Sequence, residues 1–596
     1  MNGKTGIFLF VGFLALSWCL MSGQVQIRPP WTNHGAWLDS PMLFASSGPN
    51  FFQWRTEQRE RPALPKPPGL LGGTYWARIY LVDKVRQNNP RAIVQAHDGG
   101  FLVSGESGQN DVYKPWLMKL DSGGSLEWVR STSSLINSMA RTFDGKYVGL
   151  GCVGSGNSAD LLVSKFDENG TVSWAFTYGG SGADTPGVGV IRATKDGGYI
   201  VAATSASFSG NSSNDTWLLK LSSTGGIEWE RSMGGTLADS GRFVIETGDG
   251  GYFVGAETYS FSQGINDNWF LKLNSSGVIQ WQKSMGTYDG NESPSCAVVT
   301  PDGGYLVSGW TNGVTRTADA WLVRLTSNGS VVWQKTFGGD WGESTNFITP
   351  TDDGNYMVLA YESSWPLMES GYWAFKISPA GDILWQRAYV GGSIVASLKT
   401  FDGEFVIAGT KGVAAPTSPI VDILIDKISS AGDLTASCNL TKPTVAQVIE
   451  TSFTQMNTTA SESATSATVV SASMTFASGL PMVVRDPCLT YVEEPDPPQG
   501  LSVESKINRG VFKGEVVNAL TWTSSSSNSR VTVAEYRIYR KVASQGDASY
   551  QKVGQVTSST YKYEDKVQSR TEKYSYALTA VSNTGVESQR SAPVSN

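Results

Sequence analysis

Residues 249–281 read DGGYFVGAETYSFSQGINDNWFLKLNSSGVIQW. An Asp-Gly turn opens this stretch, and the alternating run that follows it is typical of a β-strand. A second apolar run, Trp269–Leu273, leads through Gly277 to Trp281. Because glycine supplies the positive φ that tight turns need, this second part predicts a hairpin.

The same pattern recurs along the chain at intervals of 46 to 53 residues. The Asp-Gly turns begin at Asp98, Asp144, Asp196, Asp249, Asp302, Asp353 and Asp402. Seven residues after each aspartate the residue is always Gly or Ala, which implies that a neighbouring strand approaches closely there. A basic residue lies in each second run, and a glycine follows it by five residues in every copy. A tryptophan follows by nine residues in six copies, whereas the seventh has Ala436.

Each repeat therefore offers four short strands in about fifty residues, which is the pattern of a β-propeller blade. Seven copies predict an all-β fold with a seven-bladed β-propeller over residues 69–436. The missing tryptophan has a candidate source in Trp76, because Gly72–Tyr80 matches Gly170–Tyr178 in its Gly, Trp, Ala and Tyr positions. We expect this N-terminal strand to complete the last blade, so that no sheet edge stays unpaired.

The motifs DGG-Y-x-V-x-G and W-L-x-K-L-x-x-x-G-x-x-x-W give the repeats a resemblance to a known group. They resemble the secreted repeat propellers of bacteria and archaea, which are grouped loosely with the quinoprotein-like propellers. The resemblance covers residues 69–436 and is specific for fold, whereas propellers of this kind host many functions. A quinone cofactor is not expected, because the chain has seven repeats and lacks an adjacent cysteine pair.

The N-terminus has the features of an export signal. Lys4 precedes the uncharged run Ile7–Leu16, and the whole segment 1–23 fits a signal peptide better than a membrane span. Cleavage is not clearly marked, so an N-terminal anchor stays open as the alternative. Residues 24–68 have no assignment. We expect the rest of the chain to be secreted or displayed at the cell surface.

Residues 437–492 are rich in serine and threonine, a composition that favours a stalk or loose linker. Cys438 and Cys488 bracket this segment. In an oxidising compartment a disulfide between them would stabilise the protein by roughly 4 kcal/mol in the chain-entropy model. The alternative is a pair of free thiols.

The last segment, residues 493–596, resembles a fibronectin type III domain. The resemblance implies a β-sandwich with Trp522 in its core and Tyr574 in the tyrosine-corner position. The strands that carry it are Pro497–Val503, Leu520–Trp522, Tyr536–Arg540 and Tyr574–Val581. Such modules usually serve as spacers.

The composition excludes several kinds of partner. Lys+Arg is 46 and Asp+Glu is 53, so the net charge is −7, and a nucleic-acid partner is not expected. The chain has only two histidines, His34 and His97, which makes a multi-histidine metal site or a His-relay active site hard to build. No metal and no cofactor is expected.

Two acidic series recur with the repeat. One precedes the opening strands, at Asp184, Asp239, Glu292 and Glu343; the other precedes the third strands, at Asp160, Asp215, Asp267, Asp319 and Asp422. They could form a ring of carboxylates for a cation or for acid–base chemistry. Their regular repetition favours the alternative that they accept backbone hydrogen bonds in loops. The basic series is interpreted in the same way.

Positions that break the repeat are the better site candidates. We select the residues Glu106, Glu257, Trp310 and Tyr361, which follow the invariant small position, and Trp341 and Trp365, which interrupt loops. Loops between second and third strands, and between blades, emerge on one face, and aromatic side chains there could stack on sugars or anchor a protein. The alternative for each tryptophan is packing between blades.

These observations favour a non-enzymatic, extracellular recognition or scaffold protein that binds a glycan or a surface protein through the propeller's loop face. The alternative is a carbohydrate-active enzyme, a lyase or hydrolase, that uses carboxylates on that face. An enzyme should bring unrepeated acidic residues together in one pocket, whereas a binding protein should present a shallow aromatic patch.

Overall fold

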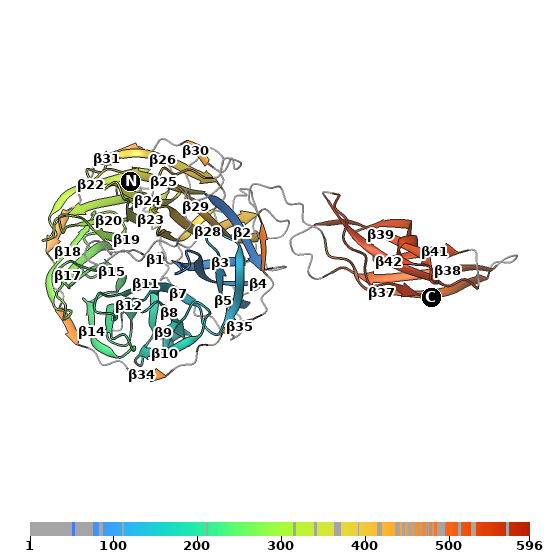
Figure 1. Ribbon diagram of the computed structural model, residues 1–596, viewed down its shortest axis with the longest axis horizontal. Coiled ribbons are helices and arrows are strands. Elements are labelled where there is room, and N and C mark those ends of the chain that lie inside the picture. The colour runs from blue at the N-terminus through green and yellow to red at the C-terminus, as the bar shows by residue number, and fades with distance from the viewer. Residues whose placement is uncertain are drawn as a thin grey trace, which may run out of the picture. The chain divides into compact units, whose positions relative to one another are not determined.

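The computed structural model (Figure 1) describes residues 75–82, 87–109, 112–209, 213–313, 318–338, 342–362, 371–390, 392–413, 420–434, 495–509, 514–525, 532–567, 571–583 and 585–596, and short strands at 51–53 and between 441 and 485. The described residues form β-strands with two short 3-10 turns, so the fold is all-β as expected. Among these residues no helix has the length and hydropathy to cross a membrane. The chain divides into two compact units, one formed by Met1–Leu81, Asn88–Lys411 and Asp422–Cys488, the other by Val82–Gln87, Gly412–Val421 and Leu489–Asn596.

In the first unit, which we call the ring unit, successive repeats form antiparallel sheets whose four strands follow chain order. Figure 1 shows these sheets arranged around a common centre, with the first strand of each innermost. This is a propeller-like repeat fold. The sheets are β7–β10 (Ile136–Arg141, Tyr147–Val153, Asp160–Phe166, Val172–Gly179), β11–β14 (Asp184–Ala193, Tyr199–Ser205, Asp215–Leu221, Ile227–Gly234), β15–β18 (Asp239–Glu246, Tyr252–Thr258, Asp267–Leu273, Ile279–Gly286), β19–β22 (Glu292–Val299, Tyr305–Thr311, Asp319–Leu325, Val331–Gly338) and β23–β26 (Glu343–Pro350, Tyr356–Glu362, Gly371–Ile377, Ile383–Val390).

The first and last repeats share one larger sheet. The first repeat contributes β3 (Gln87–Gln95), β4 (Phe101–Gln109), β5 (Val112–Leu120) and β6 (Leu126–Thr132), and the last contributes β27 (Ser393–Lys399), β28 (Phe405–Val413) and β29 (Ile420–Ile428). The N-terminal strand β2 (Trp76–Val82) pairs antiparallel with β29, and Trp76 lies opposite Lys427. The last repeat thus receives its fourth strand from the N-terminal side of the chain, as the sequence predicts.

The serine- and threonine-rich segment differs from the loose linker that its composition favours. It carries seven short strands, and each adds to the outer edge of one sheet, in the reverse of chain order. We call these strands the return strands. They are β30 (Thr441–Pro443) on β26, β31 (Gln447–Glu450) on β22, β32 (Thr454–Asn457) on β18, β33 (Ser461–Ala464) on β14, β34 (Thr468–Ser471) on β10, β35 (Phe476–Ser478) on β6 and β36 (Met482–Arg485) on β2.

The invariant small residues lie where the innermost strand bulges toward the second strand. A Cβ added at Gly151 would lie 2.0 Å from the carbonyl oxygen of Leu135, and one at Gly409 would lie 1.8 Å from that of Ser393. The pairing register shifts at this point, between Ile136 and Ser138 in the first case. A side chain larger than Gly or Ala would therefore displace the bulged backbone.

The repeated tryptophans pack against the repeated turn glycines, as Trp229 and Gly277 show. The ring of Trp229 lies 2.8–3.0 Å from the position of a Cβ at Gly277, and its Nε1 donates a hydrogen bond to the oxygen of Ser275 at 3.0 Å. Trp229 lies on β14, the fourth strand of one repeat, and Gly277 lies in the turn between β17 and β18 of the next repeat. The same packing of one sheet against its neighbour recurs for Trp174, Trp281, Trp333 and Trp385, whereas Gly170 meets Arg130 and Phe476 instead of Trp128. The same packing places Trp76 against Gly124, the turn of the first repeat.

This packing predicts different effects for two glycine substitutions. Gly277 and Gly250 have similar positive φ values, 77° and 78°, but only Gly277 faces a tryptophan ring, and Gly250 has no atom within 4 Å of an added Cβ. Gly250→Ala should cost about 1 kcal/mol from backbone strain. Gly277→Ala should cost about 2–4 kcal/mol, because overpacking adds to the strain. Urea unfolding of both variants measures this difference, and equal costs would contradict the packing argument.

The second unit contains two antiparallel sheets over residues 499–595. One holds β37 (Gln499–Arg509), β38 (Gly514–Thr523) and β41 (Lys562–Val567), and the other holds β39 (Val533–Val542), β40 (Gln551–Thr557), β42 (Tyr574–Ser582) and β43 (Val594–Ser595). Their core includes the buried residues Leu520, Trp522, Tyr536, Ile538 and Leu578. This unit is a two-sheet β structure with the tryptophan in its core, where the sequence predicts it.

Several predictions fall on residues outside the described ranges. They concern the export signal over 1–23, the candidate residues Trp341 and Trp365, and the pair Cys438 and Cys488. They stay predictions.

Candidate functional site

The Asp-Gly turns and glycine turns lie at one end of the sheets, which we call the turn end. There the repeated basic residue of the third strand pairs with the turn aspartate in every repeat, and the six lysine pairs have N–O distances of 2.6–2.9 Å. The basic side chains are buried, whereas most of the aspartates are half exposed. The pairs are Lys119–Asp98, Lys165–Asp144, Lys220–Asp196, Lys272–Asp249, Arg324–Asp302, Lys376–Asp353 and Lys427–Asp402.

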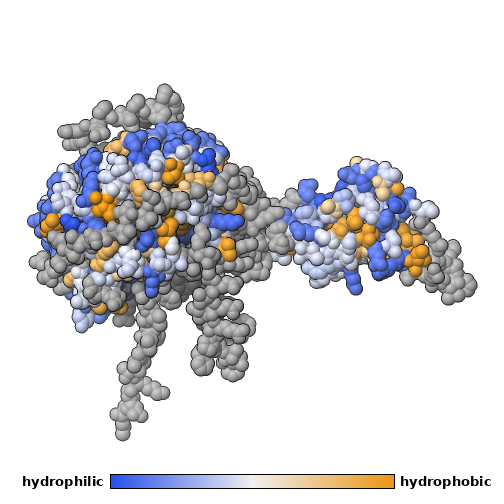
Figure 2. All heavy atoms as spheres, turned by 90° about the horizontal axis from the view of Figure 1, so that it is seen from below, coloured by the Kyte–Doolittle hydropathy of each residue, from blue (hydrophilic) through white to orange (hydrophobic). Residues whose placement is uncertain are grey.

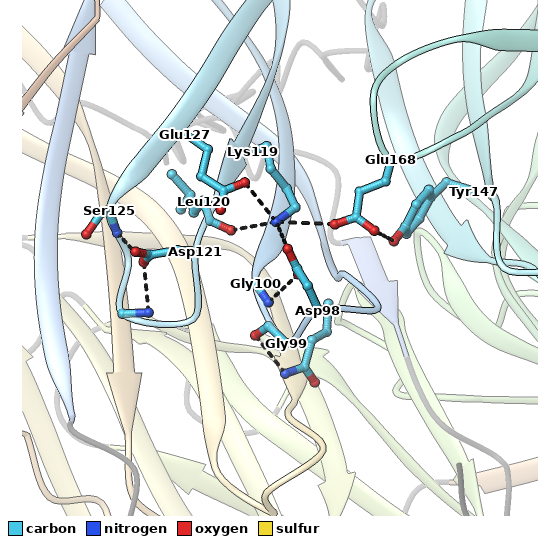
Figure 3. Close-up of polar contacts among 12 residues, drawn as sticks. Asp98, Gly99, Gly100, Lys119, Leu120, Asp121, Ser125, Glu127, Tyr147 and Glu168 are labelled. Carbon is cyan, nitrogen blue, oxygen red and sulfur yellow. Dashed lines mark hydrogen bonds and ion pairs between the residues drawn. The ribbon is translucent and has the colours of Figure 1, made fainter. Parts of the chain in front are cut away.

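Figure 3 shows the first of these pairs in its surroundings. The amino group of Lys119 contacts Asp98 at 2.6 Å, Glu127 at 3.2 Å and Glu168 at 3.3 Å. In the equivalent site of the fourth repeat, burial would raise the pKa of Asp249, but hydrogen bonds from Thr247 and Lys272 lower that pKa to about 2. The basic series is thus occupied in fixing the turns and offers nothing to a ligand.

At the opposite end, which we call the loop end, the two acidic series meet in pairs. Asp267 begins the third strand of one sheet and Glu292 begins the first strand of the next. An added Cβ at Gly286 would lie 2.3 Å from Asp267 Oδ1 and 2.7 Å from Glu292 Oε2, so both carboxylates converge over that glycine. Similar convergence occurs at Gly179 for Asp160 and Asp184 and at Gly338 for Asp319 and Glu343.

In three of these pairs one carboxylate, that of Asp184, Asp239 or Glu292, is well supplied with hydrogen bonds. Asp239 accepts from the backbone N–H of Gly235 at 2.8 Å, from Ser260 Oγ at 2.7 Å and from Thr258 Oγ1. Its partner Asp215 keeps a buried Oδ1 without a hydrogen bond. Burial, followed by the charge of Asp239, raises the pKa of Asp215 to about 7. This arrangement favours the protonated form of Asp215.

Burial also acts on the next pair. Burial raises the pKa of Asp267 to about 6 and that of Glu292 to about 7. Both side chains are fully buried, which places them out of reach of a substrate. In the part of the chain that the structure describes, no group of three or more His, Cys, Asp or Glu residues is placed to hold a metal ion. The acidic series therefore has the structural role that its repetition favours.

The selected candidates lie on second strands of different sheets. Glu106 on β4 pairs with Arg91 at 2.5 Å. Tyr361 on β24 is half-buried, and burial raises the pKa of its hydroxyl. Trp310 on β20 is half-buried and lies opposite Ser293 in the sheet register. These positions are equivalent in the repeat, so they lie around the centre of the unit rather than in one pocket.

Glu257 is the candidate with the richest surroundings. Its carboxylate accepts from Arg242, from Asn266 Nδ2 at 3.0 Å and from Ser293 Oγ at 3.2 Å. Ser293 belongs to β19, so Glu257 joins two neighbouring sheets and lies near Trp310. The structure thus brings two of the selected residues together and leaves Glu106 and Tyr361 on other sheets.

Four exposed apolar side chains lie on the loops beside Glu257. Leu237 is 54% exposed, Tyr259 40%, Ile265 55% and Tyr288 79%. Eleven large apolar side chains are exposed among the described residues, so more than a third of them gather on these loops. Clustering of this kind marks an interaction site more often than scattered exposure does. We call these four residues the loop patch.

Hydrogen bonds fix the loops that carry the patch. The N–H of Leu237 donates to Ser260 Oγ at 2.9 Å, and that of Tyr259 donates to the oxygen of Ala238 at 3.0 Å. The N–H of Ile265 donates to the oxygen of Gly290 at 3.4 Å, which ties it to the loop of Tyr288. Burial and the charge of Glu257 raise the pKa of Tyr259. The loop patch therefore adjoins the polar network around Glu257.

The sequence predictions missed these four residues. Tyr288 and Leu237 lie in loops between repeats, as Trp341 does in the next such loop. A side-by-side comparison of those loops would have found all three. Tyr259 and Ile265 lie in a loop between second and third strands that has no fixed length, so the repeat gave no signal for them.

Comparisons with known proteins show no family. None of the protein-family models matches the chain, and no curated protein matches it. Among solved structures, a Fn3-like protein from Clostridium thermocellum is 26% identical over 17% of this chain and 92% of its own, with a TM-score of 0.14. A subtype N10 neuraminidase-like protein of A/little yellow-shouldered bat is 10% identical over 59% of this chain and 96% of its own, with a TM-score of 0.28. Puromycin hydrolase is 11% identical over 75% of this chain and 61% of its own, with a TM-score of 0.36. These likenesses are distant.

Proposed function

We propose that this protein is an exported recognition or scaffold protein, without enzymatic activity, that binds a glycan or a surface protein through the loop patch. The ring unit is proposed to be a seven-bladed propeller, and the C-terminal unit a fibronectin type III-like module. Export through the N-terminal segment and a disulfide between Cys438 and Cys488 belong to the same proposal. No nucleic-acid partner is proposed, and a membrane only through an N-terminal anchor.

Three contacts support a closed ring of seven blades. The strand β2 pairs with β29, and the hydroxyl of Tyr80 on β2 donates to the oxygen of Gly124 in the first repeat. Trp76 packs against the same glycine. The last repeat thereby contacts the first, in the way that Trp229 contacts the following repeat.

The observation that carries the binding function is the loop patch. Aromatic rings with exposed faces bind sugars and protein anchors well, because they bury a large area with little loss of conformational freedom. Tyr288, at 79% exposed, has no role in the core. The neighbouring Glu257, Arg242 and Asn266 form a hydrogen-bonded rim beside it.

The alternative function, a carbohydrate-active enzyme, requires accessible acidic groups of raised pKa. The acids of raised pKa near the loop patch, Asp267 and Glu292, are fully buried and recur in other repeats. This placement favours binding over hydrolysis or elimination. The two functions remain separable by assaying any bound glycan for cleavage.

A screen of immobilised glycans and cell-wall polymers with the full chain tests the proposal. The variant with both Tyr259→Ala and Tyr288→Ala should bind the captured polymer at least tenfold more weakly, because each lost aromatic anchor costs about 1–2 kcal/mol. Tyr561→Ala is the matched control, since that tyrosine is 42% exposed but lies in the other unit. Unchanged binding by the double variant would contradict the proposal, and cleavage of the polymer would favour the enzyme.

A further inference from the structure

The C-terminal unit carries a surface hollow that the proposed function does not use. It has a volume of about 640 Å³ and lies over the sheet of β39, β40 and β42. This volume is in the range of ordinary ligand sites. Its walls include Tyr539, Tyr550, Thr579, Glu587 and Arg590. The hollow therefore offers aromatic rings together with charged and hydroxyl groups.

Arg590 lies between the two aromatic rings. Its guanidinium carbon is 5.2 Å from the ring centre of Tyr539 and 4.9 Å from that of Tyr550. One N–H donates to the backbone oxygen of Asp547 at 3.3 Å. Contact with two rings orients the planar guanidinium of Arg590. The arginine side chain therefore loses less conformational entropy when a ligand binds.

The acidic groups nearest to Arg590 are engaged by other partners. Glu587 accepts from Arg537 at 2.6 Å, from Thr579 at 2.6 Å and from Tyr539. These bonds lower the pKa of Glu587 although burial would raise it, so Glu587 is ionised and saturated.

The carboxylate of Asp547 pairs with Lys541 at 2.6 Å. Within the described ranges, no carboxylate oxygen is within ion-pair distance of Arg590. Arg590 is thus an exposed cation with no carboxylate in ion-pair contact, set in a hollow lined by tyrosine rings. Its charge still acts on Asp547, because after Lys541 it contributes to the lowered pKa of that carboxyl.

We propose that this hollow binds a carboxylate-bearing sugar, a uronate residue of an acidic polysaccharide. The guanidinium fork matches a carboxylate with two parallel hydrogen bonds. The tyrosine rings offer an apolar surface to the sugar ring beside its carboxylate. The C-terminal unit is then a second binding module, separate from the loop patch.

Calorimetry of the full chain with a tri-uronate tests this site. The oligosaccharide should bind at low salt, and its neutral methyl ester should bind at least tenfold more weakly. Arg590→Gln should also weaken binding at least tenfold, because a charge-assisted pair is lost. Lys552→Gln, which removes an exposed charge from the neighbouring strand β40, is the matched control and should change affinity by less than twofold.

Several outcomes would overturn this proposal. They are absence of uronate binding, equal binding of the methyl ester, equal binding of poly-glutamate, or full affinity in Arg590→Gln. If Arg590→Gln fails to fold, Arg590→Lys replaces it, and this variant should also bind more weakly because the fork is lost. The double variant of Tyr259 and Tyr288 should bind the uronate normally, so failure of this site is distinguishable from failure of the proposed function.

Discussion

Removal of residues 69–82 should unfold the ring unit or convert it to aggregates. This deletion takes away β2, so the edges of β29 and of the return strand β36 lose their partner. An exposed strand edge is a template for pairing between molecules. Size-exclusion chromatography and thermal unfolding measure the result. A monomeric deletion variant with unchanged melting would show that β2 does not close the ring.

The single substitution Trp76→Ala gives a graded form of this test. Trp76 is 3% exposed, and its indole donates to the oxygen of Ser122 at 3.2 Å and packs on Gly124. Its loss should cost about 3–5 kcal/mol. Trp229→Ala removes the same kind of contact between two interior repeats and serves as the comparison. Because Trp229 is only partly buried, its loss should cost no more than that of Trp76 if the ring is closed at β2, and a negligible cost for Trp76→Ala would contradict closure.

Stability of the ring unit should fall as the pH rises from 5 to 8. The folded pKa of Asp215 is about 7, above the ordinary value of 3.8, so the native state holds this proton more tightly than the unfolded state does. Its contribution is complete below pH 4 and is lost as the pH rises through 7. The folded and unfolded pKa values of Asp215 differ by about three units, which corresponds to on the order of 4 kcal/mol in the free energy of unfolding. The melting temperature, measured across this range, should decrease by several degrees.

The neutral isostere isolates the carboxylate pair. Asp215→Asn should remove much of the loss above pH 5 and raise the melting temperature at pH 8. Asp289→Asn, on an exposed loop at the same end, should leave the profile unchanged. At the turn end stability depends on pH in the opposite direction. The pKa of Asp249 is lowered in the folded state, so the contribution of this aspartate to stability is lost as the pH falls from about 4 toward 2. The shifts at Asp215 and Asp249 together predict maximal stability near pH 4–5. A flat stability profile from pH 5 to 8 would contradict the raised pKa of Asp215.

The features that the sequence could predict are those that recur. A position that must be small, such as Gly409, meets the equivalent carbonyl in each of the four repeats that carry glycine there, so the physical constraint appears in the sequence several times. Trp76 could be assigned because its surroundings match those of Trp174. The propeller-like fold and the strand β2 were predicted for this reason.

The return strands could not be predicted from composition. Each is three or four residues long, and those beginning at 447, 454, 461 and 468 recur every seven residues. Seven extended residues span roughly 23–25 Å, which carries the chain from one sheet edge to the next. Polar residues suffice for such edge strands, since backbone hydrogen bonds make the pairing. A segment that resembles a stalk in composition is therefore part of the sheets.

The candidate site was predicted only in part. Glu257 stood out because it breaks a repeated position, and the structure gives it a hydrogen-bonded network. Tyr259 and Ile265 occupy a loop whose length varies between repeats, so no repeated position existed from which they could depart. A hollow such as the one around Arg590 depends on side chains that are distant in sequence, and only their folded arrangement makes it visible.

The return strands also determine how the ring unit would respond to mechanical load. They lie at the periphery in reverse order, and the last of them, β36, pairs with β2, the strand that completes the last repeat. With Cys438 and Cys488 reduced, a pull on the chain beyond residue 488 would release β36 first and then the other return strands one by one. The proposed disulfide would close this segment into a loop and keep the return strands out of the tension. Each release in the reduced chain would free about seven residues of chain, while the four inner strands of every sheet stayed paired. A tether at that end would thus yield in stages before the core of any repeat bore the tension.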